Sequence, residues 1–489
     1  MMKKMFINGQ WIESESKETR EIINPFNQEV VESVTEGNEV DTKKAISAAR
    51  EAFDYGEWPG TPATERGLKL FKIADLIERD IEELIRLESL DTGKTVTESE
   101  ADMQDIAGVF RYYAGLADKH GGEIIDSPIP NSKSKVVREP VGVCGQITPW
   151  NYPLLQAAWK IAPALAAGNT LVMKPSEITP LTTIKVFELM EEVGFPKGVV
   201  NLVLGAGATV GNELAVSHDV DLISFTGGIM TGKKIMQAAS TNMKKIALEL
   251  GGKNPNIVFA DCDFETALDQ ALNAVYFHAG QVCSAGARLL VEDSIHDQFV
   301  DALVERVKKI KLGNGFDPET QSGPMISKEH REKVEQYVEI GKKEGAKLLV
   351  GGARPDHSDL QDGFFYLPTI FTDCTSEMTI VQEEVFGPVL TVERFHSEQE
   401  ATKLANDSIY GLAGAVWTTD IQKAERVASK LRMGTVWIND FHPYIPQAPW
   451  GGYKQSGIGR ELGSIGLEEY TELKHVYQNT DPQPLHWFK

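Results

Sequence analysis

The sequence is poor in cysteine: its 489 residues include only four, and no two of them form a CxxC pair. Such usage excludes a disulfide framework and a thiolate zinc site, and it predicts free thiols in a reducing compartment. The four are Cys144, Cys262, Cys283 and Cys374.

Long apolar runs are also missing. No segment approaches about 20 consecutive apolar residues, the length that a membrane-spanning helix needs. Near the N-terminus, Lys3 and Lys4 are not followed by an apolar stretch, because Asn8, Gly9 and Gln10 interrupt it. We therefore expect no membrane span and no secretion signal, and we expect a cytoplasmic protein.

Basic side chains are outnumbered, with 49 Lys and Arg against 71 Asp and Glu, for a formal net charge of −22. A surface of this sign repels phosphate backbones, which argues against nucleic-acid binding. It weakly favours a cationic small molecule, although solubility in a crowded or salty cytosol explains the same charge.

The remaining composition, 42% hydrophobic and 25% charged, is ordinary for a globular protein, and the length predicts two or three domains. In the first half, strand-like segments alternate with helical ones, which predicts βαβ units, a parallel sheet and a nucleotide-binding region. The expected helices cover 43–54, 67–90, 154–167 and 179–194, and the expected strands cover 141–147, 170–174, 198–204 and 222–225.

The alternation restarts after Gly251 and Gly252, with strands expected at 256–259 and 288–291 and helices at 264–278 and 295–310. This pattern predicts a second α/β domain. Near the end of the chain, residues 470–477 alternate with period two, which is typical of an edge strand that pairs with another element or subunit.

Three residues carry candidate chemistry on local grounds. Cys283 lies between Gly280 and Ser284, where the backbone can approach a ligand closely, although a lone cysteine is more often an inert core residue. Glu249 ends an apolar strand, where burial would raise its pKa toward that of a general base; a salt-bridged surface glutamate is the alternative. The Asn151 amide follows a strand and is suited either to an oxyanion or to a helix cap.

Two glycine loops, 205–211 and 225–232, each follow a strand and open a helix. Backbone amides and a helix N-terminus meet a pyrophosphate in this context, but neither loop fits GxGxxG. Lys174 and Glu177 flank a turn where they could bind ribose hydroxyls. Because an acidic side chain repels a 2′-phosphate, the pair favours NAD over NADP.

Together these segments resemble the aldehyde dehydrogenase superfamily, from near residue 6 to near residue 478. Seven motifs occur in the family's order, which makes chance agreement negligible. They are TPWNYP (148–153), MKPSE (173–177), FTGG (225–228), LELGGKNP (248–255), GQVCS (280–284), EEVFGPV (383–389) and GYKQSGIGRELG (452–463).

The resemblance implies an α/β architecture with three parts. A Rossmann-like NAD-binding domain is expected from residues 1–122 and 143–250, and an α/β catalytic domain from residues 251–450. A small β flap for oligomerisation is expected from residues 123–142 and 465–489, so we expect a homo-oligomer, either a dimer or a tetramer.

The resemblance also implies a reaction. Cys283 would attack the aldehyde carbonyl, the Asn151 amide and the Cys283 backbone N–H would hold the oxyanion, and hydride transfer would leave a thioester. Glu249 would activate water to hydrolyse that thioester to the acid. Lys160 and Glu461 match positions implicated in a proton relay behind the base. The family's CoA-acylating branch lacks the glutamate at 249, so its presence argues for hydrolysis.

For the cofactor, the resemblance implies NAD. Lys174 and Glu177 match contacts to the adenosine ribose, the glycines line the diphosphate, and Glu384 and Phe386 match contacts to the nicotinamide ribose. The full expected set is Ile147, Pro149, Trp150, Lys174, Ser176, Glu177, Gly207, Gly211, Phe225, Gly227, Gly228, Leu250, Glu384 and Phe386.

Within the family, the chain most resembles the bacterial enzymes that oxidise betaine aldehyde to glycine betaine, the second step from choline. In that group an aromatic box holds the quaternary ammonium by cation–π attraction. The matching residues are Tyr152, Trp159, Phe277 and Trp450. Aminoaldehydes or a broad range of aldehydes are the alternative substrates, since aromatic side chains also simply fill a tunnel.

The same group often binds potassium, and Asp91 matches an acidic ligand of that site; a capped turn explains this residue equally well. Functions of two other classes fit the sequence less well. A non-catalytic binding protein is disfavoured because Cys283, Glu249 and Asn151 are all present. A cysteine hydrolase using Cys283 with His278 is disfavoured because residues i and i+5 of a helix do not face each other well and no Asn or Asp partner is evident.

Overall fold

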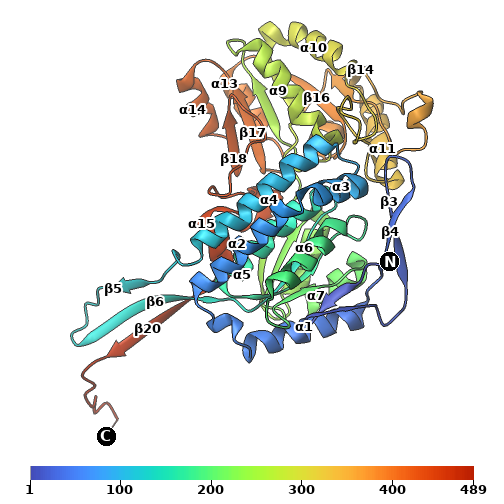
Figure 1. Ribbon diagram of the computed structural model, residues 1–489. Helices are drawn as coiled ribbons and strands as arrows, with labels where there is room; N and C mark the ends of the chain where they lie inside the picture. The colour runs from blue at the N-terminus through green and yellow to red at the C-terminus, as the bar shows by residue number, and fades with distance from the viewer. Residues whose placement is uncertain (1, 489) are drawn as a thin grey trace.

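The computed structural model describes residues 2–488. It contains two α/β lobes, each a sheet with its own helices, and a narrow arm that projects from one end (Figure 1). The first sheet has eight strands in the order β19-β11-β10-β7-β8-β9-β1-β2. Its five central strands are parallel, and the outer strands are antiparallel. The strands are β1 (Met5–Ile7), β2 (Gln10–Ile12), β7 (Val143–Ile147), β8 (Thr170–Lys174), β9 (Val200–Leu202), β10 (Leu222–Thr226), β11 (Lys245–Glu249) and β19 (Gly457–Ile458).

Helices cover this first sheet, because the crossovers between parallel strands must return over its faces. They are α1 (Glu39–Asp54), α2 (Ala63–Arg79), α3 (Ile81–Thr92), α4 (Val96–Leu116), α5 (Pro153–Ala167), α6 (Leu181–Val193), α7 (Asn212–Val216) and α8 (Ile229–Ala239). A separate hairpin, β3 (Thr19–Ile23) with β4 (Val30–Thr35), lies beside it.

The second sheet has seven strands in the order β14-β15-β16-β13-β12-β17-β18, all parallel except β14. They are β12 (Pro255–Val258), β13 (Arg288–Glu292), β14 (Lys347–Val350), β15 (Thr369–Thr372), β16 (Val389–Phe395), β17 (Ala413–Trp417) and β18 (Thr435–Ile438). Its helices are α9 (Phe264–Tyr276), α10 (Asp293–Val307), α11 (Lys328–Glu344), α12 (Thr379–Gln382), α13 (Glu398–Asn406) and α14 (Ile421–Ala428), and α15 (Gly463–Glu469) follows later in the chain.

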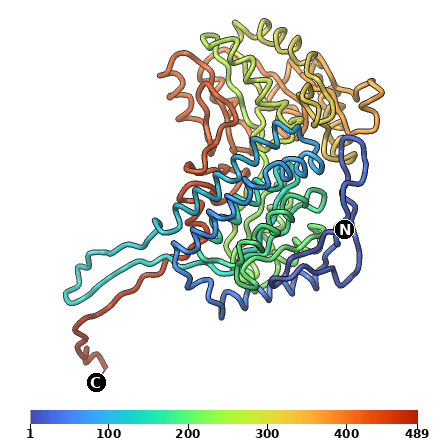
Figure 2. The backbone as a smooth tube through the Cα atoms, in the orientation of Figure 1, coloured from blue at the N-terminus to red at the C-terminus, as the bar shows by residue number. Residues whose placement is uncertain are grey.

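The arm is a three-stranded antiparallel sheet of β5 (Glu123–Ile125), β6 (Ser132–Pro140) and β20 (Thr471–Asn479). It projects away from both α/β lobes, and the chain continues from it to the C-terminus (Figure 2). The period-two alternation at 470–477 therefore predicted a strand correctly, and its partner is β6 of the same chain. The arm exposes the apolar side chains Ile124, Leu473 and Tyr477.

The helix expected over 67–90 is wrong in one respect, because it divides at Asp80. The backbone of Asp80 leaves the helical region, at φ −103° and ψ 21°, and ends α2 while opening α3. Its carboxylate is held by Arg79 at 2.7 Å and by Lys185 at 3.1 Å. Apolar spacing continues across the break, so the pattern alone does not show it.

Helix α5 is buried almost throughout, because it is apolar on every side and lies between the first sheet and the outer helices α2 and α4. It begins at Pro153, a residue suited to the first turn, and stops at Gly168, whose φ of +97° favours glycine. Within this apolar helix Lys160 is fully buried, and such a charge must be paired. In residues 2–488 no helix is both long enough and apolar enough to cross a membrane.

Candidate active site

Two cavities meet at Cys283. One, of about 210 Å³, lies at the carboxyl ends of the central parallel strands, where α/β sheets place their ligands. The other, of about 360 Å³, has a group of aromatic side chains in its lining: Tyr152, Trp159, Phe277, Tyr444 and Trp450. Cys283, Tyr152 and Gln156 line both cavities. A group bound in one cavity therefore faces a group bound in the other across the sulfur of Cys283.

Cys283 lies in an irregular segment between α9 and β13, and its carbonyl accepts a hydrogen bond from Asn254 Nδ2 at 2.9 Å. The same amide nitrogen donates to the carbonyl of Ala285, also at 2.9 Å. Burial, followed by the charges of Glu384 and Glu249, raises the pKa of the Cys283 thiol to about 12. The free thiol is thus protonated, and its reaction as a nucleophile requires a base.

The other three cysteines lie outside the residues that line either cavity. Cys144 is buried in β7, Cys374 is buried in the core below the second sheet, and Cys262 is half-buried. Cys144 and Cys374 are thus core residues, as expected, whereas Cys262 packs at the edge of the core.

Glu249 ends β11 and lines the smaller cavity, and neither of its carboxylate oxygens has a hydrogen-bond partner. Its side chain is buried. Burial, with the charge of Glu461 second, raises its pKa well above the ordinary value, while Lys160 acts in the opposite direction. A buried carboxyl group of raised pKa that faces a cavity without a partner is equipped to take a proton from a bound molecule.

Lys160 pairs with Glu461, the residue expected behind the base, and this ion pair offsets the cost of burying its charge. Its ammonium also donates to Thr226 Oγ1 at 2.7 Å, and Thr226 in turn donates to Gln156 Oε1 at 3.0 Å. Gln156 and Thr226 line the smaller cavity, so a chain of polar groups leads from the cavity to the Lys160–Glu461 pair. Gln156 was not among the residues expected from the sequence.

Asn151 lies between β7 and α5, and its Nδ2 donates to the carbonyl oxygen of Gln281 at 2.8 Å. It does not act as a cap of α5, since the residue at the cap position is Tyr152 and no side chain caps that helix. A side-chain amide has two N–H donors, so one remains for a group in the smaller cavity, which Asn151 lines together with Cys283.

The expected cofactor residues fall into two groups. Seven line the smaller cavity: Pro149, Trp150, Gly227, Gly228, Leu250, Glu384 and Phe386. The other seven do not line it: Ile147, Lys174, Ser176, Glu177, Gly207, Gly211 and Phe225. Within this second group, an added Cβ on Gly211 would lie 3.7 Å from Ile147 and 4.0 Å from Lys174, and Lys174 pairs with Glu177 at 2.9 Å.

An aromatic wall of the smaller cavity includes a histidine that the sequence did not reveal. The ring of His330 lies 5.0 Å from that of Trp150 and 5.9 Å from that of Phe386. Burial lowers the pKa of His330 to about 4, so the ring is neutral and its Nε2 can donate to the carbonyl of Phe386 at 2.7 Å. Lys333 also lines this cavity. His330 and Lys333 lie outside the seven motifs, and no local pattern marks them.

All four expected box residues, Tyr152, Trp159, Phe277 and Trp450, line the larger cavity. The rings of Trp159 and Trp450 have centroids 6.0 Å apart. Tyr444, which was not expected, extends the aromatic surface, with its ring 5.2 Å from Trp159.

Two acidic residues of α4, Asp102 and Asp105, also line the larger cavity and were not expected. Asp105 accepts a hydrogen bond from the Tyr444 hydroxyl at 2.7 Å. Asp102 pairs with the buried Lys94 at 2.5 Å. Their spacing of three residues on one helix was a usable signal, since it places both on one face.

Asp91 lies at the end of α3, away from both cavities, and is fully buried. Its Oδ2 accepts the backbone N–H of Leu181 at 3.1 Å, whereas its Oδ1 has no partner. Burial, with the charge of Glu88 second, raises the pKa of Asp91 well above its ordinary value. Across residues 2–488 no group of three or more His, Cys, Asp or Glu side chains is arranged to hold a metal ion.

The chain matches known proteins over its whole length. The sequence profile of the Aldehyde dehydrogenase family matches residues 11–476. Betaine aldehyde dehydrogenase of Bacillus subtilis (strain 168) is 74% identical over 488 residues, covering 100% of both proteins, and the mitochondrial aldehyde dehydrogenase of Homo sapiens is 46% identical over 97% of this chain and 91% of its own.

Among solved structures, a crystal structure of betaine aldehyde dehydrogenase from Staphylococcus aureus in complex with NAD⁺ superposes with a TM-score of 0.99. It is 66% identical in sequence and covers 99% of this chain and 96% of that one. The chain therefore belongs to the aldehyde dehydrogenase family. Both the resemblance drawn from the seven motifs and the predicted α/β fold are confirmed.

Proposed function

We propose that this protein oxidises betaine aldehyde to glycine betaine with NAD, through a covalent bond to Cys283. The observation that carries the proposal is the position of Cys283 at the junction of two cavities, one at the carboxyl ends of the parallel strands and one lined by aromatic rings. The names of the Bacillus subtilis and Staphylococcus aureus relatives support the same substrate, and the bound NAD⁺ of the latter supports the cofactor.

The residues around the smaller cavity fit NAD. An added Cβ on Gly207 or Gly228 would meet nothing within 4 Å, so the loops expected to carry the diphosphate are open to a ligand. Glu384, which lines the cavity, accepts the backbone N–H of Gly252 at 2.9 Å and is thereby fixed for a contact to the nicotinamide ribose. When bound, NAD supplies the hydride acceptor.

The protein's own groups perform the covalent step. Because burial and nearby carboxylates hold Cys283 as a thiol, its proton passes to water in the cavity as the sulfur attacks the carbonyl carbon, and Glu249 remains available for the later hydrolysis. The carbonyl oxygen becomes an oxyanion, which the second N–H of Asn151 and the backbone N–H of Cys283 stabilise. Loss of hydride from the carbon then leaves a thioester on Cys283.

Hydrolysis of the thioester depends on Glu249. Its carboxylate takes a proton from water, and the resulting hydroxide attacks the thioester carbonyl and releases the acid and the thiol. Lys160 and Glu461 lie close enough for their charges to shift the pKa of Glu249, and they form the inner end of a route by which its proton leaves.

The larger cavity suits a small organic cation. Each aromatic ring contributes roughly 0.5–2 kcal/mol of cation–π attraction when the site excludes water. The carboxyl group of Asp105, on the same wall, adds negative potential, whereas the charge of Asp102 is offset by its pairing with Lys94. A trimethylammonium group has no N–H to donate, so aromatic faces and diffuse negative charge are the chemistry that recognises it.

An aldehyde panel tests this proposal. With NAD in excess, kcat/KM for betaine aldehyde should exceed that for the uncharged propionaldehyde by about 10- to 100-fold, which corresponds to one or two effective cation–π contacts. NADH absorbance gives the rates, and an aminoaldehyde of similar length is the matched control for charge alone. Equal rates for betaine aldehyde and propionaldehyde would remove the argument from the aromatic cavity.

Potassium is the proposed monovalent cation at Asp91. The unpartnered Oδ1 of this buried carboxylate is the oxygen such an ion needs, and an ion there would offset the charge that burial penalises. Replacing a bulky buffer cation with K⁺ at equal ionic strength should raise the Tm by roughly 1 °C, as expected for about 1 kcal/mol of binding to a protein of this length. The Asp91→Asn variant should lose this response, and a response equal to that of the wild type would place the ion elsewhere.

The rival functions fit less well. His278, the base that a cysteine hydrolase would need, packs its ring against Tyr152 with centroids 5.7 Å apart, lines neither cavity, and has its pKa lowered well below the ordinary value by burial. A non-catalytic role leaves the cavity-facing Glu249 unexplained. The division into domains, the cytoplasmic location and the homo-oligomer stay predictions; the exposed apolar side chains of the arm favour the last of these.

A further inference from the structure

The segment that leads into Cys283 is strained. His278 and Ala279 have φ values of +48° and +52°, in the left-handed region that disfavours residues with a Cβ, and Gly280 follows at +73°. An added Cβ on Gly280 would lie 2.2 Å from the carbonyl oxygen of Gly387, so the chain passes close to a neighbour at this point. Such a backbone persists only where its surroundings hold it in place.

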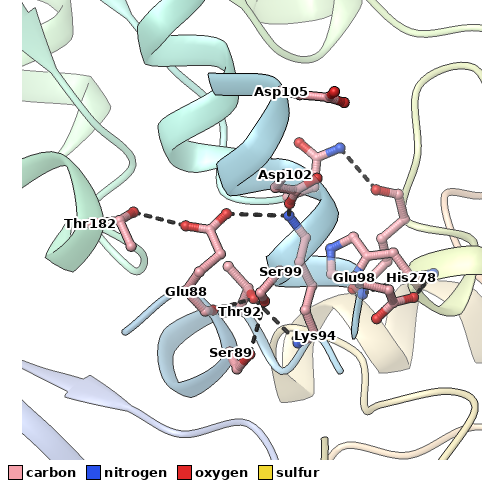
Figure 3. A network of polar contacts seen from close by, with 12 residues as sticks. Glu88, Ser89, Thr92, Lys94, Glu98, Ser99, Asp102, Asp105, Thr182 and His278 are labelled. Atoms are coloured by element: carbon pink, nitrogen blue, oxygen red, sulfur yellow. Dashed lines mark hydrogen bonds and ion pairs between the residues drawn. The ribbon is translucent and has the colours of Figure 1, made fainter. Parts of the chain in front are cut away.

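Side chains from other parts of the fold hold this segment. The backbone N–H of His278 donates to Glu98 Oε1 at 2.7 Å (Figure 3), and Glu98 is 180 residues away in the sequence. Further along, the Gln281 side chain donates to the carbonyl of His278 at 3.2 Å and accepts the backbone N–H of Ile326 at 2.9 Å. With the Asn151 bond to the Gln281 carbonyl, these contacts fix both ends of the four-residue segment 278–281 that precedes Val282 and Cys283.

Glu98 is itself held from the opposite side. It is the third residue of α4, and its Oε2 accepts hydrogen bonds from the backbone N–H and the hydroxyl of Thr95 at 2.8 and 2.9 Å. Thr95 Oγ1 accepts the N–H of Glu98 in return, which completes a capping box. One buried carboxylate therefore joins the first turn of α4 to the segment before Cys283.

The start of α4 provides a firm base for this contact. Lys94, the residue before Thr95, is fully buried, and its ammonium pairs with Glu88 at 3.2 Å and with Asp102 at 2.5 Å (Figure 3). The same ammonium lies 3.9 Å from the centroid of the Tyr152 ring, a wall of both cavities. The turn that contacts His278 is thus fixed to the wall of the substrate cavity.

We infer that Glu98 is a positioning residue, whose carboxylate holds the strained segment His278–Gly280 and so places the sulfur of Cys283 opposite Asn151. Neither cavity is lined by Glu98, so it acts through His278 and touches no reacting atom. The inference rests on the proposed function, because it takes Cys283 as the nucleophile. Its alternative is that Glu98 serves only to cap α4.

The Glu98→Gln variant separates these roles. Both oxygens of Glu98 accept hydrogen bonds, whereas glutamine has one oxygen, so its NH₂ group must face an N–H donor of either Thr95 or His278. The Thr95→Ala variant is the matched control, because it weakens the same cap and leaves the bond to His278 intact. The readouts are the rate constant for alkylation of Cys283 by iodoacetamide, followed by mass spectrometry, the pre-steady-state rate of NADH formation, and the Tm.

We expect Glu98→Gln to slow both Cys283 alkylation and NADH formation by about tenfold or more, since displacements near 1 Å at a reacting group have effects of this size. Its KM for NAD should stay close to that of the wild type. Thr95→Ala should lower the Tm while both rates remain close to wild type. If Glu98→Gln slows the rates no more than Thr95→Ala does, Glu98 is only a cap and the inference is wrong.

Two further measurements test the positioning role if the variant does not fold and separate it from the proposed function. Should Glu98→Gln fail to fold, hydrogen exchange in the wild type decides: peptides spanning 277–283 should be as protected as the central strands, and fast exchange there would overturn the inference. A Cys283→Ala variant that still turns over would refute the proposed function. An inactive Cys283→Ala together with an unimpaired Glu98→Gln would refute the positioning role alone.

Discussion

The Cys283→Ala variant is expected to lose NAD-dependent oxidation of betaine aldehyde by about 10⁴-fold or more, the size of effect seen when an enzymatic nucleophile is removed. No other cysteine can substitute, because Cys144, Cys262 and Cys374 line neither cavity. The loss should appear in kcat, since without the sulfur no covalent intermediate forms.

Binding of NAD to Cys283→Ala should remain close to that of the wild type. Alanine removes one sulfur atom at the edge of the smaller cavity and leaves the glycine loops and Glu384 unchanged. Titration of NAD against intrinsic tryptophan fluorescence measures this, because Trp150 lines that cavity. The half-buried Cys262 supplies the control, as Cys262→Ala should keep full activity. Turnover by Cys283→Ala at the wild-type rate would rule out the covalent mechanism.

The nucleophile and its neighbours were predictable because each lies within a short motif. Cys283, Glu249 and Asn151 were each ambiguous on local evidence, and only the ordered set of seven motifs made them a site. The structure then brings the three residues together in the lining of one cavity. In the sequence, Asn151 lies about a hundred positions before Glu249, and Glu249 lies well before Cys283. The carboxyl ends of parallel strands β7 and β11 meet at this edge, and that meeting follows from the βαβ pattern.

The residues that sequence reasoning missed act through tertiary contacts. His330 reaches the cofactor cavity from α11, and Tyr444 reaches the aromatic cavity from a loop after β18. Glu98 contacts His278 across 180 positions. Periodicity and turn signals report neighbours along the chain. They predicted helices such as α1, α5, α6, α9 and α10 and strands such as β7, β8, β9, β10, β12, β13 and β20, and they gave no information on these contacts. The break at Asp80 was not predicted because the apolar spacing of α2 continues into α3, so the local pattern shows one helix.

The Glu249→Gln variant should produce a rapid burst of NADH, stoichiometric with its active sites, and then nearly stop. Hydride transfer does not need the base that hydrolyses the thioester, whereas water attack does, and loss of a general base slows such a step by about 10²- to 10⁴-fold. Stopped-flow absorbance of NADH measures both the burst and the slow phase. Mass spectrometry of the quenched protein should find the acyl group on Cys283.

An external nucleophile checks the assignment of the stalled state. Hydroxylamine attacks thioesters without a general base, so it should restore NADH production by Glu249→Gln while having little effect on the wild type. In the wild type, the hydrolysis rate should rise with pH through the raised pKa of Glu249, because burial favours its protonated form and only the carboxylate accepts a proton from water. The Glu249→Gln variant should lose that rise. Continuous turnover by this variant, with the wild-type pH profile, would mean that a different group activates the water.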